Sequence, residues 1–149
     1  MRPEEVAACE AVRDTIARYA HAVDRGKFDD AAACFAEDGV LDVKDAGRHE
    51  GRDAIAAMFA SAGRRLASSS ENALVRHHVS SIRFESVARD TARVSSYFAV
   101  FTDVGLDHWG RYRDVLASFQ GRWLFAHRRI TVDGFAADSL MSAGPVRER

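Results

Sequence analysis

The order of apolar and polar residues divides the chain into a helical first half and a stranded second half. From residue 3 to residue 25, apolar side chains recur at steps of three and four, which is the spacing of one helix face. Pro3 suits the first turn of this helix. A second helix is predicted over 28–38, and a third over 54–66 with Asp53 as its N-cap.

Four strand-like runs follow the third helix, and short turn signals separate them. Short links between successive strands predict an antiparallel meander. A shorter strand and a hairpin link stand between the second and third helices. The strands are predicted over 40–43, 76–87, 91–104, 108–119 and 122–133.

Helices first and strands last predict an α+β domain. Three helices packed on one face of a curved sheet would leave a concave apolar pocket between the two layers. The length of 149 residues suits one domain, spanning 1–149. Its core is expected at about 5–133, with a loose tail over 139–149.

Composition and charge exclude several classes of function. The net charge is −1, which sets up no field for nucleic acid or an acidic membrane. No apolar run approaches the roughly 20 residues of a membrane span, and acidic residues near the N-terminus argue against a signal peptide. Cys9 and Cys34 are predicted to be small buried residues of a cytoplasmic protein, and no metal-ligand spacing is present.

Asp24 is out of place by local rules. It adjoins the apolar face of the first helix, at the end where the macrodipole disfavours a negative charge. Such exceptions concentrate at functional sites, although a simple turn with Arg25 and Gly26 would also explain it. Tyr19 lies on the same broad face, either as a core tyrosine or as a donor pointing into the pocket.

Two adjacent histidines, His77 and His78, open the first long strand, where neighbouring side chains point to opposite faces. Alternation places His78 with the apolar Ile82 and Phe84, and therefore favours His78 as the inward residue. A bulge within the strand would reverse this assignment. Periodicity alone leaves both histidines as candidates.

Further polar candidates lie on the later strands. Tyr112 and Asp114 share a strand face with His108, as a solvated pair or as an acid/base and a donor facing the pocket. Asp103 ends the second long strand. His127 and Arg128 point to opposite faces of the last strand, and either could reach the pocket mouth. The candidate substrate-binding residues are Tyr112, Asp114, Asp103 and Arg128.

The order of elements and several sequence stretches resemble the SnoaL-like branch of the nuclear transport factor 2-like superfamily. This branch includes scytalone dehydratase, bile acid 7α-dehydratase and hexachlorocyclohexane dehydrochlorinase. The resemblance covers about 5–133 and implies a cone-shaped α+β barrel. It rests on the stretches "YAHAVDRGKFDDAAACFAEDGVLDV", "GRDAIAAMF", "RHHVSSIRFE" and "GRYRDVLASFQGRWLFAHRRI".

The resemblance implies a catalytic pair of Asp24 and His77, with Tyr19 beside it, and an irregularity in the strand at 79–81. It implies a lyase or isomerase without metal or organic cofactor, acting on a small, mostly apolar, oxygenated ring compound by proton abstraction and elimination. A polyketide cyclase, a hydrolase and a non-catalytic ligand-binding module are the alternatives on this scaffold. The implied assembly is a homodimer or homotrimer, through the sheet face that carries Trp109.

Overall fold

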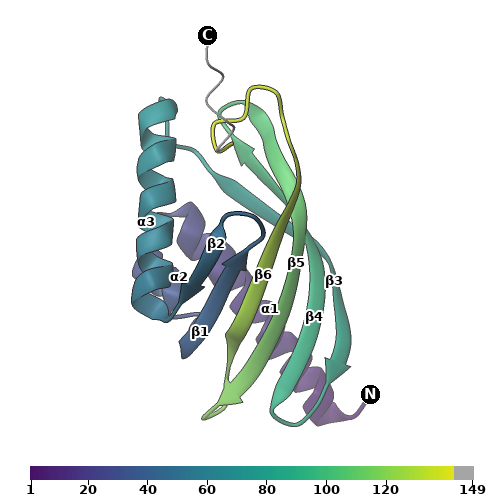
Figure 1. The fold of residues 1–149 in the computed structure, drawn as a ribbon. Helices are drawn as coiled ribbons and strands as arrows, with labels where there is room; N and C mark the ends of the chain where they lie inside the picture. The colour runs from purple at the N-terminus through teal and green to yellow at the C-terminus, as the bar shows by residue number, and fades with distance from the viewer. Residues whose placement is uncertain (143–149) are drawn as a thin grey trace.

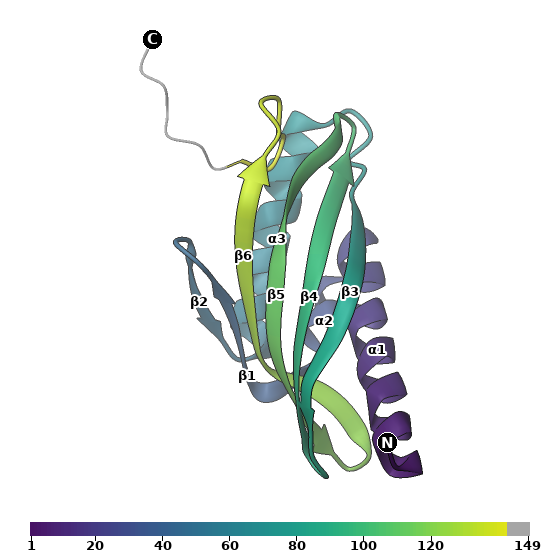
Figure 2. The same ribbon diagram turned by 90° about the vertical axis from the view of Figure 1, so that its right-hand side faces the viewer.

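The computed structural model describes residues 1–142, in which helices cover one side of a curled six-stranded sheet (Figure 1). One long helix, α1, runs beside the edge strand β3 (Figure 2). The helices are α1 (Pro3–Asp24), α2 (Phe28–Ala32) and α3 (Arg52–Ser69). The strands are β1 (Phe35–Val43), β2 (Gly47–Glu50), β3 (Arg76–Val87), β4 (Thr91–Thr102), β5 (Gly105–Phe119) and β6 (Arg122–Phe135).

The sheet has the strand order β2-β1-β6-β5-β4-β3. Strands β3 to β6 form the predicted antiparallel meander, and β1 and β2 form a hairpin. The pairing of β1 with β6 is parallel, and it joins the first half of the chain to its last strand. Local sequence signals predict hairpins between neighbouring strands. They do not predict the pairing of β1 with β6, because these two strands lie far apart in the chain.

The predicted second helix over 28–38 is wrong in its second half, because α2 ends at Ala32 and β1 begins at Phe35. The ring of Phe35 is fully buried, with its centroid 5.1 Å from that of Phe125 on β6. Burial against β6 therefore overrides the local helical pattern. The prediction of Asp53 as the N-cap of α3 is also wrong. Gly51 is the N-cap, with φ of 82°, and Asp53 lies in the first turn of the helix.

A buried core joins α1, α3 and the inner face of the sheet. Cys9 and Cys34 are free and buried, as predicted. Aromatic rings dominate the centre, where Tyr19 of α1 makes edge contacts with rings from four other elements. The fully buried large side chains include Arg128, Tyr19, Tyr112, Phe35, Phe125, Ile16, Leu41, Ile55 and Leu116.

The hydroxyl of Thr15 fastens α1 to the start of β6, donating to the carbonyl of Trp123 at 2.6 Å. Valine has nearly the same shape but cannot donate, so Thr15→Val leaves this buried carbonyl without its partner. We expect a loss of about 1–3 kcal/mol in the free energy of unfolding, measured by urea titration. The exposed Thr91→Val should change it by less than about 0.5 kcal/mol. Equal effects of the two substitutions would contradict the role of Thr15.

The sheet face turned away from the helices carries large exposed side chains. Tyr97 is 57% exposed and Trp109 is 39% exposed. Trp109 covers Gly134, where an added Cβ would lie 2.5 Å from the indole ring. Assembly into a homodimer or homotrimer through this face stays a prediction. No helix within residues 1–142 is both long and apolar enough to cross a membrane.

Candidate functional site

The end of α1 and the start of β3 meet at a carboxylate–imidazole pair. The Asp24 carboxylate lies 2.6 Å from Nδ1 of His77, and it also accepts the backbone N–H of His77 at 3.0 and 3.2 Å. The two side chains are only 12% and 14% exposed. Because a carboxylate accepts hydrogen bonds, Nδ1 of His77 donates and Nε2 is left to accept a proton.

A bulge in β3 explains why His77, rather than His78, faces inward. The pairing with β4 shifts between Ser80 and Arg83, and Ser81 adopts φ of 52°. The bulge places His77 on the same face as Ile82, so the alternation argument for His78 is wrong. His78 is exposed, and its ring lies 4.9 Å from that of Phe101. The implied irregularity at 79–81 is thus confirmed.

The pair lines a groove between α1 and β3 with a volume of about 420 Å³. Basic side chains surround an apolar lining, so the groove suits a small apolar compound that also carries oxygen. The apolar lining is Ile16, Ala17, Ala20, Val79 and Ile82, and the basic side chains are Arg13, His21, Arg25 and Arg76.

A buried ion pair lies in the interior beside the aromatic core. Arg128 makes a two-pronged contact with Asp114, at 2.8 Å from Nε and 2.9 Å from Nη2, and both side chains are 0% exposed. The guanidinium carbon lies 3.8 Å from the ring centroid of Tyr112 and 4.4 Å from that of Tyr19. Nη1 of Arg128 is buried and has no hydrogen-bond partner in residues 1–142.

Two predicted donors, Tyr19 and Tyr112, belong to this packed interior. Each is 2% exposed. Burial raises the pKa of Tyr19 to about 12, although the neighbouring Arg128 charge opposes the shift. Burial likewise raises the pKa of Tyr112. Both phenols therefore stay protonated at neutral pH and can act only as uncharged hydrogen-bonding groups.

Two predicted substrate-binding residues hold other side chains instead. Both carboxylate oxygens of Asp114 are taken by Arg128, so Asp114 orients the guanidinium. Asp103 is exposed and accepts hydrogen bonds from the Ser70 hydroxyl and the Asn72 backbone N–H, which lower its pKa. Asp103 therefore fastens the loop after α3 and does not reach the interior.

Sequence reasoning missed a second carboxylate–imidazole pair at the start of β5. Nδ1 of His108 lies 2.7 Å from the fully buried carboxylate of Asp107. The strand pattern placed His108 on the face of Tyr112 without giving it a role. Asp107 adjoins an irregularity in the pairing of β4 with β5, which period-two counting cannot locate.

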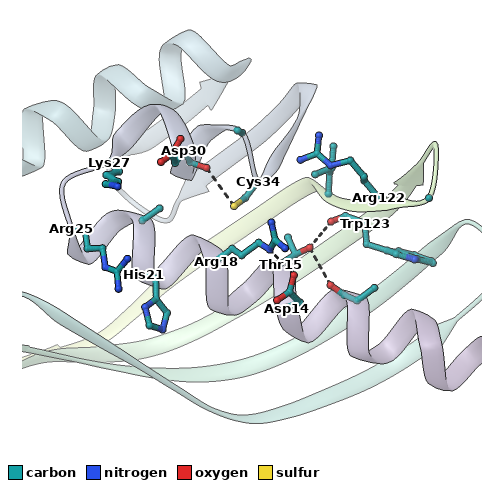
Figure 3. Close-up of a pocket in the computed structure, with 15 residues that line it drawn as sticks. Asp14, Thr15, Arg18, His21, Arg25, Lys27, Asp30, Cys34, Arg122 and Trp123 are labelled. Atoms are coloured by element: carbon teal, nitrogen blue, oxygen red, sulfur yellow. Dashed lines mark hydrogen bonds and ion pairs between the residues drawn. The ribbon is translucent and has the colours of Figure 1, made fainter.

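A larger hollow of about 570 Å³ lies against the part of α1 that faces α2 and the β5–β6 turn (Figure 3). Its charged lining includes both signs, and Asp14 pairs with Arg18. His21 and Arg25 line this hollow as well as the groove. Within residues 1–142, no three histidine, cysteine or acidic side chains gather as a metal site would require.

The model of one family, the SnoaL-like domain, matches residues 4–129 of the chain. No protein of curated function matches the sequence. A solved variant of Rv3472, a protein of unknown function from Mycobacterium tuberculosis, is 26% identical, with a TM-score of 0.76. That match covers 96% of this chain and 83% of the other.

Two further solved structures share the fold at lower identity. A proposed scytalone dehydratase from Novosphingobium aromaticivorans has a TM-score of 0.79 at 19% identity, covering 100% of this chain and 99% of the other. LinA has a TM-score of 0.75 at 18% identity, covering 95% of this chain and 97% of the other. Together these structures establish that the arrangement of helices and curled sheet is shared.

Proposed function

This chain belongs to the family of SnoaL-like domains, and from that premise we propose that it is a cofactor-independent lyase or isomerase. Its substrate is a small, mostly apolar, oxygenated ring compound. The observation that supports this proposal is the 2.6 Å contact of Asp24 with His77 on the wall of an apolar groove. A module that only binds ligands would have no need of such a pair.

In the proposed reaction, His77 is the general base. Its Nε2 atom takes a proton from a carbon next to a carbonyl or a leaving group, so that the C–H bond breaks and a double bond forms. In a dehydration, the C–O bond then breaks and the hydroxyl leaves with a proton as water. Asp24 fixes the tautomer of His77 and stabilises the imidazolium.

Arg128 supports this chemistry from the interior. Arg128 does not line the groove, so its buried positive charge acts through space and favours negative charge on the substrate, because electrostatic interactions are strong where water is excluded. Within residues 1–142, Nη1 is the nitrogen of Arg128 without an acceptor, since Asp114 accepts from Nε and Nη2. Tyr19 and Tyr112, which stay protonated, complete the polar part of this interior in the proposal.

An assay that does not require the natural substrate tests whether His77 is a general base. A nitrobenzisoxazole loses its ring C–H proton to a base, its N–O bond breaks, and a coloured cyanonitrophenolate forms. We expect the wild-type protein to accelerate this reaction, and His77→Gln to lower the rate by about 10²–10⁴-fold. The neighbouring His78→Gln is the matched control and should keep the wild-type rate. Full activity in His77→Gln would remove His77 from the mechanism.

A further inference from the structure

Asp107 of β5 connects three parts of the structure through one carboxylate. It accepts hydrogen bonds from four donors, which lie in β4, in β5 and in the segment after β6. Burial alone would raise the pKa of Asp107, but the hydrogen bonds outweigh it and lower the pKa. The donors are His108 Nδ1 at 2.7 Å, Thr102 Oγ1 at 2.9 Å, Ser139 Oγ at 2.6 Å and the Leu140 backbone N–H at 2.8 Å.

These contacts change the expected picture of the tail. Of the predicted loose segment 139–149, residues 139–142 are held in place by hydrogen bonds. Leu140 and Met141 pack against an apolar cluster that includes Val100 and Tyr112. Residues 143–149 lie outside the described part of the chain. The segment from 139 to 142 therefore covers part of the inner apolar surface.

His108 and His77 lie in one row across the sheet. Val100 of β4 pairs with His77 on one side and with His108 on the other, and Val100 is fully buried. Neighbouring strands are about 4.8 Å apart, so the two histidine Cα atoms are separated by about 10 Å. Cross-strand partners share a face, and the curl of the sheet turns this face inward. The two imidazoles thus flank the buried side chain of Val100 on one face of the sheet.

The chemical state of His108 makes it a hydrogen-bond acceptor. Because the Asp107 carboxylate accepts from Nδ1, the Nε2 atom carries the free lone pair. Burial lowers the pKa of His108, although Asp107 opposes the shift, so the imidazole is neutral at pH 7. The ring lies 6.2 Å from Phe98 and 5.5 Å from Phe135, between centroids, and these rings give it apolar surroundings.

We propose that His108, oriented by Asp107, is a second ligand-contacting imidazole, and that it selects ring compounds bearing a hydroxyl group. The ligand hydroxyl donates to Nε2 of His108 while the reacting carbon faces His77. Two imidazole acceptors on one face of the sheet favour a ligand that donates over one that only accepts, such as an aldehyde. This inference rests on the proposed function for the role of His77, and it adds the substrate class.

The test uses phenol as the probe and ¹⁵N-resolved NMR of the histidine rings in the full chain. We expect saturable shifts of the Nε2 resonances of both His77 and His108 on addition of phenol, and much smaller shifts with benzaldehyde. His108→Gln should weaken phenol binding by roughly two- to tenfold, the size of one hydrogen bond. Asp103→Asn, which alters an exposed carboxylate nearby in the chain, is the matched control and should leave it unchanged.

A second variant tests Asp107 as a positioning residue. Asp107→Asn should weaken or reverse the preference of His108 for the Nδ1–H tautomer, as measured in the ¹⁵N spectrum. A purely structural role of Asp107 would not produce this effect. If Asp107→Asn does not fold, the titration of the wild-type protein with phenol still tests whether His108 contacts the ligand. A titration in which His108 does not shift, with or without a shift of His77, would overturn the inference.

The same titration separates this inference from the proposed function. Shifts of both imidazoles without turnover of the nitrobenzisoxazole would retain His108 as a ligand contact and reject proton abstraction by His77. Turnover that depends on His77, with no shift of His108, would retain the proposed function and reject the second contact.

Discussion

The double variant Asp24→Asn/His77→Gln should be no slower in nitrobenzisoxazole turnover than His77→Gln alone. The two side chains are joined at 2.6 Å and act through one proton acceptor, so loss of the imidazole removes whatever Asp24 contributes. Asp24→Asn by itself should cost roughly 10–10²-fold, because a hydrogen bond to a charged group contributes about 1.5–3 kcal/mol. Rates of the three variants complete a double-mutant cycle.

The controls for this cycle follow from the second role of Asp24. Its carboxylate also accepts the His77 backbone N–H, which an asparagine side-chain oxygen can still do. We therefore expect the urea midpoints of the three variants to stay close to that of the wild type, so that the rate losses do not report unfolding. Losses that multiply, with the double variant much slower than His77→Gln, would show that the two residues act independently.

Asp114→Leu should be the most destabilising single change described for this protein, costing about 3–5 kcal/mol of unfolding free energy. The substitution leaves the Arg128 guanidinium fully buried and without its counter-charge. The Arg128→Met/Asp114→Leu double variant removes both charges and should recover much of that loss, since apolar pairs often replace buried ion pairs without cost. Urea titration of the three proteins gives the comparison.

Comparing stability and turnover in these variants shows whether the Asp114–Arg128 ion pair serves the fold or the reaction. A double variant that is stable but slow in turnover would indicate that Arg128 is retained for its charge. If Asp114→Leu alone is as stable as the wild type, the guanidinium finds another partner, and the account of a dependent ion pair is wrong.

The sequence was most informative where structure is local. The bounds of β3 match the predicted strand, because its alternating side chains lie between a polar loop and a short turn. The long first helix follows equally directly from its apolar spacing. The β1 strand was missed over 35–39, since its start is buried against Phe125, about 90 positions later in the chain.

The candidate site could be predicted only in part, for a similar reason. Asp24 was visible as a charge at the wrong end of a helix. The choice between His77 and His78, however, depended on a bulge that alternation cannot reveal. The pairing of Asp114 with Arg128 depends on the register of β5 with β6, which places the two residues opposite each other. Without that register, Asp114 looked free to bind a substrate.

The bulge between Ser80 and Arg83 also bears on unwanted edge-to-edge pairing of β3 with other chains. β3 is one of the two edge strands of the sheet. A straight edge strand offers unpaired backbone N–H and C=O groups, with which a strand of another chain can pair. The kink interrupts that row while it aims His77 inward. A change that straightens β3 would turn the imidazole of His77 away from the interior. It would also expose an edge that promotes fibrous aggregation, so the position of His77 and the protection of the edge both favour the bulge.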